Sequence, residues 1–412
     1  MNITIAGHVD HGKSTLIGRI LLDTRSLSKG KMEELSRVSR ELGKEAELAY
    51  LADQLKEERE QERTIDTTQS FFKTRKRRYC IIDVPGHVEF LKNMITGATQ
   101  ADSAMLLIDA KAGIEEQTRR HAYIVGMIGI PLHIAVINKM DLVSYSEERF
   151  GELSSGLLDF TRRISAKEPL VIPISARHGD NITSRSLKMR WYKGPCLTEA
   201  LDRLEVAKGS SEKPLRFAVQ DSYIIDGERI IVGKVLSGKI AARQHIKLLP
   251  SSKDARVEAI KIFGGQLRQA MAGENVGLKL NDPSLAKRGE IICDSTCAAE
   301  SCDGFRANIF WMSDRPLRKN DGLLLRCSTQ KTECRAEIIE RRINSSTFEV
   351  LEEDAQALNA NEAGTVIFST ERPVIVERPD QTEELGRFVL DSGGETVGAG
   401  IIVSASRQGR GL

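Results

Sequence analysis

Apolar and polar residues follow two different patterns along this chain, and the change lies near residue 204. Before it, short strand-like runs such as residues 2–6 and 104–108 alternate with longer stretches whose apolar residues recur at helical spacing, as in LIGRILLD after Thr15. Short buried strands that alternate with helices are typical of a mostly parallel sheet with flanking helices. The first half of the chain is therefore predicted to be an α/β domain.

Beyond this point the chain passes through a polar stretch that contains Gly and Ser, VAKGSSEKP at residues 206–214, which has the composition of a linker. The segments that follow alternate apolar and polar residues between glycine-rich turns, as small antiparallel β-barrels do. Two such series are present. We therefore expect an α/β domain over residues 1–207 and two antiparallel β-barrel domains over residues 208–300 and 301–412.

A complete phosphate-binding loop joins the first predicted strand to the first predicted helix. It reads GHVDHGKST, and a strand precedes it and a helix follows it, as such a loop requires, because its backbone N–H groups converge on phosphate oxygens at a helix N-terminus. The residues expected to bind phosphate are Gly7, His8, Val9, Asp10, His11, Gly12, Lys13, Ser14 and Thr15. This pattern predicts a site for a nucleoside triphosphate.

Later strand ends supply the groups that complete such a site. Asp83 follows the apolar run YCII, and Gly86 lies three residues further on. An aspartate at a strand end can hold a water bound to Mg²⁺, while the Gly86 N–H can meet a terminal phosphate. The position of this loop would then depend on the nucleotide.

The guanine base is indicated by Asn138, Lys139 and Asp141, which follow the strand-like run HIAVI. The Asp141 carboxylate can accept hydrogen bonds from N1 and N2 of guanine, whereas adenine has no such donor pair, so discrimination should be strong. Ser175 and Ala176 lie at another strand end, where a backbone N–H could reach guanine O6. Single motifs of this kind also occur in unrelated loops, but their joint order after successive strands argues against coincidence.

With these motifs in place, the chain resembles the translation-factor class of GTPases, similar to elongation factors Tu and 1-alpha and to the large subunit of sulfate adenylyltransferase. The resemblance rests on GHVDHGKST, EREQERTID, DVPGHVEFLKNMITGATQAD, NKMD and PISARHGDN. It implies an α/β P-loop GTPase domain with GTP and Mg²⁺ as cofactors. Lys13 would bind the β- and γ-phosphates, and the metal would be held by Ser14, Thr64 and, through its water shell, Asp83. The implied catalytic residues are Lys13, Thr64, Gly86 and His87, with His87 positioning the attacking water.

One departure from the family pattern precedes Thr64. Glu62 and Arg63 stand where relatives usually have Gly and an apolar residue. In relatives the apolar residue forms part of a hydrophobic gate beside the catalytic histidine, and Arg63 cannot form that gate in the same way. Arg63 could contact phosphate as an arginine finger, but we favour a solvated loop position.

The resemblance leaves three functions open. We favour the GTPase subunit of sulfate adenylyltransferase, because ANIFWMSDRPLRKNDGLLL and INSSTFEVLE in the last barrel resemble that family. Such a subunit couples GTP hydrolysis to formation of adenylylsulfate from ATP and sulfate by a separate catalytic small subunit, in a heterodimer or higher assembly. The alternative is a translational GTPase that carries aminoacyl-tRNA or a release factor to the ribosome, since GHVDHGKS and ELGRFVL look closer to elongation factor 1-alpha. A regulatory GTPase outside both pathways is the third class.

Composition narrows the partners and the compartment. The net charge of +2 gives no strong field toward nucleic acid or membranes, and aromatic residues make up 5% of the chain, which argues weakly against RNA. The seven cysteines lack the spacing of a zinc ribbon and are expected to be free thiols. The first residues enter a strand without a targeting pattern, so we expect a cytoplasmic protein.

Overall fold

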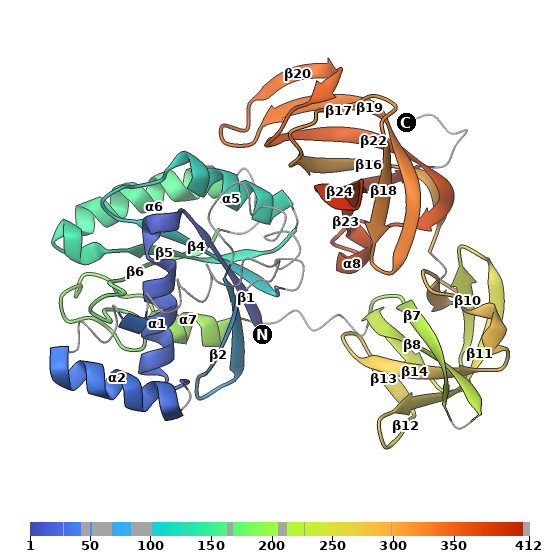
Figure 1. The fold of residues 1–412 in the computed structure, drawn as a ribbon, viewed down its shortest axis with the longest axis horizontal. Coiled ribbons are helices and arrows are strands. Elements are labelled where there is room, and N and C mark those ends of the chain that lie inside the picture. The colour runs from blue at the N-terminus through green and yellow to red at the C-terminus, as the bar shows by residue number, and fades with distance from the viewer. Residues whose placement is uncertain are drawn as a thin grey trace. The chain divides into compact units, whose positions relative to one another are not determined.

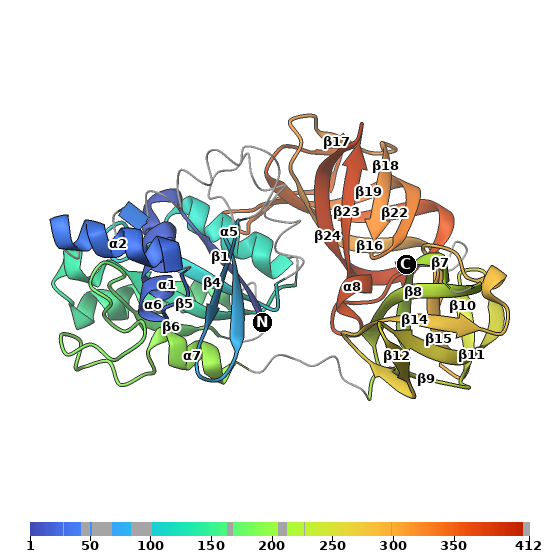
Figure 2. The same ribbon diagram turned by 60° about the horizontal axis from the view of Figure 1, so that its bottom comes forward.

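The structure of the chain, a computed structural model, divides into two compact units. The first comprises Met1–Val206 with Ser345–Thr347, and the second comprises Ala207–Asn344 with Phe348–Leu412 (Figures 1 and 2). The structure describes residues 1–27, 29–42, 50–51, 68–83, 101–127, 129–162, 168–204, 212–225, 227–297 and 299–406. The limits predicted for three separate domains stay a prediction.

A sheet of six strands forms the centre of the first unit, in the order β2-β3-β1-β4-β5-β6. Neighbouring strands are parallel except that β2 is antiparallel to β3. The strands are β1 (Asn2–Gly7), β2 (Thr68–Lys73), β3 (Arg78–Asp83), β4 (Ser103–Asp109), β5 (Leu132–Asn138) and β6 (Leu170–Pro173). Strand β4 is buried along its whole length, as expected for an apolar strand of a sheet covered on both faces.

Helices flank this sheet. They are η1 (Val9–His11), α1 (Lys13–Asp23), α2 (Lys29–Leu42), α5 (Glu116–Met127), η3 (Met140–Val143), α6 (Glu147–Thr161) and α7 (Leu197–Arg203). Helices α1 and α7 contribute to the core on one face, while α5 contacts β1, β4 and β5 (Figure 1). The α/β part of the predicted fold class is therefore confirmed.

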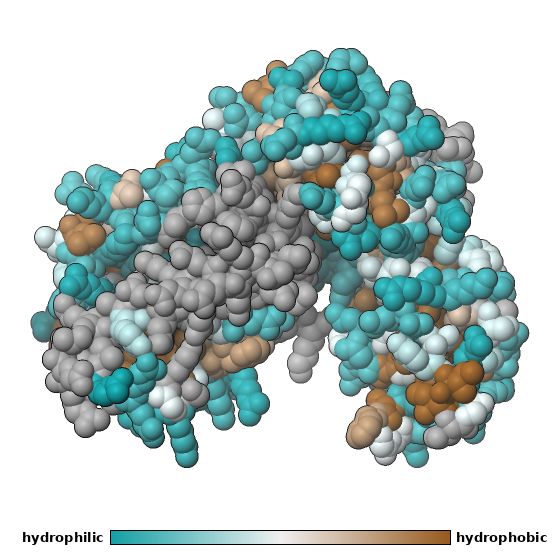
Figure 3. All heavy atoms as spheres, in the orientation of Figure 1, coloured by the Kyte–Doolittle hydropathy of each residue, from teal (hydrophilic) through white to brown (hydrophobic). Residues whose placement is uncertain are grey.

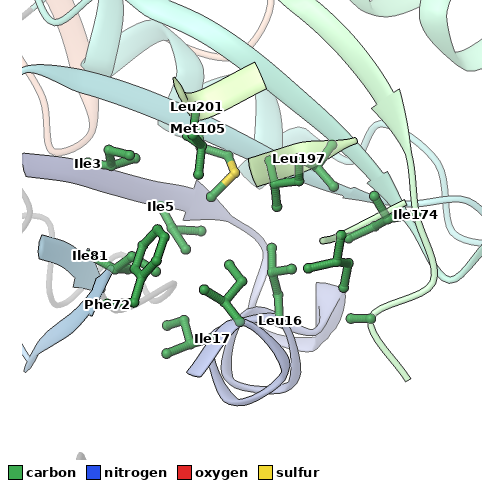
Figure 4. Close-up of a cluster of buried hydrophobic side chains, with 14 of the residues drawn as sticks. Ile3, Ile5, Leu16, Ile17, Phe72, Ile81, Met105, Ile174, Leu197 and Leu201 are labelled. Atoms are coloured by element: carbon green, nitrogen blue, oxygen red, sulfur yellow. The ribbon is translucent and has the colours of Figure 1, made fainter. Parts of the chain in front are cut away.

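The core on the α1 face determines how the phosphate-binding loop leaves the sheet. Ile3 and Ile5 of β1 pack in one buried cluster with Leu16 of α1 and Leu197 of α7 (Figure 4). Because α1 begins at the end of that loop, its packing against β1 fixes both ends of the loop. Truncation of a fully buried leucine such as Leu16 to alanine is expected to cost about 2–5 kcal/mol of stability.

The second unit begins with an antiparallel barrel. Seven strands follow the order β10-β15-β7-β8-β14-β11-β12, pairing of β10 with β11 closes the ring, and β9 pairs with β13. Its elements are β7 (Arg216–Ile225), β8 (Glu228–Ser237), β9 (Lys239–Ala241), β10 (His245–Leu249), β11 (Lys253–Ile262), β12 (Gly265–Leu267), β13 (Gln269–Met271), β14 (Asn275–Leu280), η4 (Pro283–Leu285) and β15 (Ile291–Asp294).

A second antiparallel barrel completes this unit. Its strand order is β18-β23-β24-β16-β22-β19-β20, closed by pairing of β18 with β19, and β17 pairs with β21. Its elements are β16 (Ser301–Trp311), β17 (Leu317–Arg318), β18 (Gly322–Cys327), β19 (Gln330–Asn344), β20 (Val350–Ala355), β21 (Ala357–Leu358), β22 (Glu362–Ile375), α8 (Glu383–Gly386), β23 (Arg387–Ser392) and β24 (Glu395–Ser406). The two predicted antiparallel barrels are thus confirmed.

Large apolar side chains gather on the surface of the first barrel. Ile224 is 72% exposed and Phe263 is fully exposed. Ile225, Ile262 and Phe263 line a groove of about 760 Å³ on this barrel, whose surface carries apolar residues (Figure 3). Exposed apolar patches are typical of surfaces that contact another molecule. Across the described ranges, no helix combines the length and apolar character that a membrane crossing would need.

Candidate functional site

The predicted phosphate-binding loop, residues 7–15, lies at the C-terminal edge of the parallel strands. Gly7 ends β1 and pairs in register with Leu107 of β4. Gly12 has φ 90°, and a Cβ atom there would lie 2.7 Å from Asn138 Nδ2. Glycine is therefore required at this position both for the backbone conformation and for the close approach of Asn138. Helix α1 begins at the next residue and directs its free N–H groups to the loop.

Lys13 lies within the loop, as predicted from the motif. Its side chain is buried, and Nζ donates hydrogen bonds to the carbonyl oxygens of Gly7 at 2.6 Å and His8 at 3.4 Å. These carbonyl groups hold the ammonium inside the curve of the loop. From this position the ammonium group can donate its hydrogen bonds to phosphate oxygens without a movement of the backbone.

Ser14 and Asp83 place a hydroxyl and a carboxylate on neighbouring elements. Ser14 is the second residue of α1, and Asp83 ends β3 in register with Ile5 of β1, which leads into the loop. Both side chains are buried, with exposed fractions of 6% and 4%. A hydroxyl and a carboxylate are the hard oxygen ligands that suit Mg²⁺, so the residues present fit this metal. The predicted residues Thr64, Gly86 and His87 lie outside the described residues.

Lys139 connects the guanine motif to the phosphate-binding loop. Its Nζ lies 2.6 Å from Asp109 Oδ2 and donates to the Asp10 carbonyl oxygen at 2.7 Å. Burial alone would raise the pKa of Asp109, but hydrogen bonds from Lys139 and from the Ala112 and Lys111 N–H groups lower this pKa below its ordinary value. Asp109 is therefore ionised and holds Lys139 over the loop. The sequence prediction did not include Asp109. Its position at the end of the apolar strand β4 is the same signal that identified Asp83.

Asn138 is the most buried polar residue of the guanine motif, with 1% exposure. Its Nδ2 donates to the His11 carbonyl oxygen at 3.0 Å, and its Oδ1 accepts the Ala176 N–H at 3.0 Å. The Ala176 N–H, one of the backbone donors that the sequence offered for guanine O6, is thus already used by Asn138 in this structure. Asn138 joins three loops that are distant in sequence.

Asp141 presents a carboxylate oriented by its neighbours. Ser175 Oγ donates to Oδ1 at 2.6 Å, and His178 Nε2 lies 4.0 Å from Oδ2. The side chain remains 14% exposed. An oriented, partly accessible carboxylate is what recognition of the guanine N1 and N2 hydrogens requires. The structure therefore brings the Asp141 and Ser175 side chains into contact, and their role in binding guanine stays a prediction.

Two further residues support the site, and the sequence prediction did not include them. Arg19 of α1 donates from Nε to the Ala176 carbonyl oxygen at 3.1 Å, which ties α1 to the Ser175–Ala176 loop. His121 of α5 is 2% exposed, and its ring lies close to the Gly7 backbone and to Lys13. Burial and the nearby Lys13 ammonium lower the pKa of His121 to about 3, so its ring is neutral.

Comparison with known families agrees with this geometry. The model of the elongation factor Tu GTP-binding domain matches residues 1–215, that of elongation factor Tu domain 2 matches residues 228–293, and the GTP-eEF1A C-terminal domain-like model matches residues 304–403. These matches cover the nucleotide-binding loops and both barrels.

The relatives include elongation factors 1-alpha and sulfate adenylyltransferase subunits 1, with almost equal identity to this chain. Elongation factor 1-alpha of Pyrococcus furiosus is 36% identical over 99% of this chain and 98% of its own length. Sulfate adenylyltransferase subunit 1 of Yersinia enterocolitica is 37% identical over 96% of this chain and 84% of its own length. The bifunctional enzyme NodQ of a Rhizobium species is 38% identical over 98% of this chain, which spans 63% of that protein. The chain therefore belongs to the translation-factor class of GTPases, with a GTP-binding domain of the elongation factor Tu type.

Proposed function

We propose that the chain is the GTPase subunit of a sulfate adenylyltransferase. In this role GTP hydrolysis is coupled to formation of adenylylsulfate from ATP and sulfate, and a separate catalytic subunit carries out that transfer. The observation that carries the proposal is the similarity to sulfate adenylyltransferase subunit 1 over 96% of the chain, together with the ANIFWMSDRPLRKNDGLLL segment of the second barrel.

That segment forms a fixed turn between β16 and β18. The indole Nε1 of the buried Trp311 donates to the Arg315 carbonyl oxygen at 2.8 Å, and the Arg318 N–H donates to Asp321 Oδ2 at 2.9 Å. The Arg315 side chain is 80% exposed. A rigid turn that displays a charged side chain is suited to contact a partner subunit.

The hydrolytic step is assigned to the nucleotide site of the first unit. Lys13 would contact the β- and γ-phosphates, and Ser14, Thr64 and Asp83 would hold Mg²⁺. When bound, Mg²⁺ neutralises charge on the phosphate oxygens. Within the proposal, Gly86 meets the γ-phosphate and His87 positions the attacking water. Most of the rate enhancement in phosphoryl transfer comes from such positioning and charge stabilisation.

Assembly with a separate subunit and a cytoplasmic location belong to the same proposal. The exposed apolar residues of the first barrel, including Ile224 and Phe263, offer contact area for a heterodimer or higher assembly. All seven cysteines are free thiols, as is usual for proteins of a reducing compartment.

A translational GTPase that carries aminoacyl-tRNA or a release factor is the second candidate. It is favoured by one observation: the chain aligns with 98% of elongation factor 1-alpha of P. furiosus at 36% identity. Under this function the partner would be a tRNA or release factor and the ribosome, and hydrolysis would depend on the ribosome.

The deciding experiment copurifies the chain with the product of a neighbouring small-subunit reading frame. Adenylylsulfate formation from ATP and sulfate is measured with GTP, with GDP and with a nonhydrolysable GTP analogue. We expect adenylylsulfate to form faster with GTP than with GDP or with the nonhydrolysable analogue. Equal rates in all three conditions would refute the sulfate role, and GTP hydrolysis stimulated by ribosomes would favour the translational one.

The catalytic assignment of His87 has its own test. A His87→Ala variant should bind GTP as the wild type does but lose activated hydrolysis by about 100-fold or more, in line with the loss of a positioned proton-transfer group. A matched control is His245→Ala, in the first barrel. Normal hydrolysis by His87→Ala in the presence of the activator would remove His87 from the mechanism.

A further inference from the structure

A cluster of three metal-ligating side chains lies beside the phosphate-binding loop. It consists of His8, His11 and Glu115, whose ligand atoms all lie within 4.8 Å of one another. His11 Nε2 is 2.9 Å from Glu115 Oε2, and His8 Nδ1 is 3.6 Å from the same oxygen. Glu115 immediately precedes α5, so the cluster joins this helix to the loop.

The surroundings of His11 favour a cation between these side chains. Its ring is 2% exposed and faces an acceptor on each side, because Nδ1 lies 3.0 Å from the Leu107 carbonyl oxygen and Nε2 faces the Glu115 carboxylate. A neutral imidazole has one N–H and can satisfy only one acceptor. With Nδ1–H directed to the Leu107 carbonyl, the Nε2 lone pair is available to a metal, which is the usual arrangement of metal-binding histidines.

The spacing of the ligand atoms suits a tetrahedral ion. Zinc binds imidazole nitrogen and carboxylate oxygen at about 2.0–2.2 Å, which places neighbouring ligand atoms about 3.3 Å apart. The two distances to the Glu115 oxygen, 2.9 Å and 3.6 Å, lie on either side of this value, and the two histidine nitrogens lie within 4.8 Å of each other. The His8 and Glu115 side chains are 31% and 41% exposed, so an ion can enter from solvent and keep a water as its fourth ligand.

We propose that His8, His11 and Glu115 bind a divalent transition-metal ion of the zinc type, at a site separate from the Mg²⁺ of the nucleotide. Two imidazole ligands select zinc, cobalt or nickel over Mg²⁺, which prefers oxygen. The His8 carbonyl oxygen also accepts a hydrogen bond from Lys13. A metal on the His8 ring would therefore restrain the loop that surrounds the phosphates and slow the release of GDP.

The test uses the full chain. Treatment with a chelator first removes bound transition metals, and the chain is then loaded with GDP and millimolar Mg²⁺. Co²⁺ or Zn²⁺ alone is titrated into this protein. We expect one ion per chain by calorimetry, and a Co²⁺ spectrum typical of nitrogen and oxygen ligands. Absence of a thiolate charge-transfer band separates this site from the exposed Cys297. In the wild type, bound Zn²⁺ should slow GDP release.

Glu115→Gln is the informative variant, because loss of a ligand should weaken Co²⁺ binding by more than the roughly 10–100-fold that removal of an outer partner costs. In the presence of chelator, the GDP affinity of Glu115→Gln should equal that of the wild type. This equality would show that the variant is folded. Glu116→Gln is the matched control, since that carboxylate pairs with Arg120. Co²⁺ affinity equal in Glu115→Gln and wild type, or no binding in either protein, would overturn the proposal and leave only a hydrogen bond between His11 and Glu115.

Discussion

The side-chain nitrogen of Asn138 lies 3.0 Å from the carbonyl oxygen of His11, so the guanine motif and the phosphate-binding loop share a buried hydrogen bond. The other end of the same amide accepts the Ala176 N–H. Because this one side chain links three loops, hydrogen bonds connect the position expected for the base to the position expected for the phosphates. A change at Asn138 should therefore affect the whole nucleotide and not the base alone.

Replacement of Asn138 by alanine tests this connection. It leaves the His11 carbonyl and the Ala176 N–H without their partner, at a cost of about 1–3 kcal/mol for each buried group. We expect a lower melting temperature and weaker binding of both GTP and GDP, measured by fluorescent nucleotide release.

Asn181→Ala is the matched control for this variant. Asn181 is equally buried, and its amide bonds the Pro173 carbonyl and the Ser186 N–H away from the loop. It should lower stability but leave the nucleotide affinity of the folded protein intact. If both variants lost stability and affinity alike, Asn138 would have only a structural role.

The base specificity is expected to depend on Asp141. Asp141→Asn replaces an acceptor oxygen by an NH₂ donor, which suits the C2 carbonyl of xanthine and not the amino group of guanine. The affinity of the variant for GTP should fall by about 100-fold or more. The variant should bind xanthosine triphosphate more tightly than the wild type does, as measured by competition. An unchanged preference for GTP would show that Asp141 does not contact the base.

Ser175 provides a smaller effect at the same carboxylate. Its hydroxyl donates to Asp141 Oδ1 at 2.6 Å. Ser175→Ala should weaken GTP binding by roughly tenfold, about 1.4 kcal/mol, because the carboxylate loses the group that orients it. The preference for guanine should remain, which distinguishes orientation from direct recognition.

The parts of the site that the sequence could predict are those with local patterns. The phosphate-binding loop follows a strand and precedes a helix within a few residues, and NKMD follows an apolar run, so each could be placed on the C-terminal edge of a sheet. The structure confirms this fold. Thr64, Gly86 and His87 stay predictions because they lie outside the described residues.

Contacts between distant segments could not be read in this way. Glu115 meets His11 across 104 positions of sequence, and Arg19 reaches the Ala176 carbonyl across 157. These contacts depend on strand order, which places β1 between β3 and β4. A single sequence does not specify that order, so side chains on the neighbouring strands could not be paired. The use of the Ala176 N–H by Asn138 was missed for the same reason.

The buried ring of His121 makes the stability of the first unit dependent on pH. Burial and the Lys13 ammonium lower its pKa from 6.5 to about 3 in the folded chain. Above pH 6.5 the ring is neutral in both states, whereas at lower pH the unfolded chain takes up a proton that the folded chain does not. Stability is therefore lost as the pH falls from 6.5 toward 3, by about 1.4 kcal/mol at pH 5.5.

His121→Leu should remove this dependence, because leucine has no proton to take up. Trp191 lies in the first unit and Trp311 in the second, so a Trp311→Phe background lets Trp191 fluorescence report urea unfolding of the first unit. The difference in unfolding free energy between pH 7.5 and pH 5.5 should be about 1.4 kcal/mol smaller in the leucine variant. Equal differences in the two proteins would show that folding does not lower the pKa of His121.

A buried ion pair holds the two barrels of the second unit together. Arg216 of β7 donates from Nε to Glu377 Oε1 at 2.8 Å, and its Nη2 lies 2.7 Å from the same oxygen. The two side chains are 7% and 13% exposed. Arg216 Nη1 also donates to the carbonyl oxygens of Leu215 and Cys297. The guanidinium is thus almost fully hydrogen-bonded in a place where water has little access.

Removal of one partner should be more damaging than removal of both. Glu377→Leu leaves the Arg216 charge buried without its counter-ion, which typically costs about 3–5 kcal/mol, while the double variant with Arg216→Met replaces the pair by apolar groups of similar volume. We expect the double variant to recover most of the loss, measured by urea unfolding with Trp311 fluorescence in a Trp191→Phe background. If the losses of unfolding free energy in the two single variants instead add up in the double variant, the two side chains are not coupled. Each would then stabilise the barrels independently, through packing and backbone contacts.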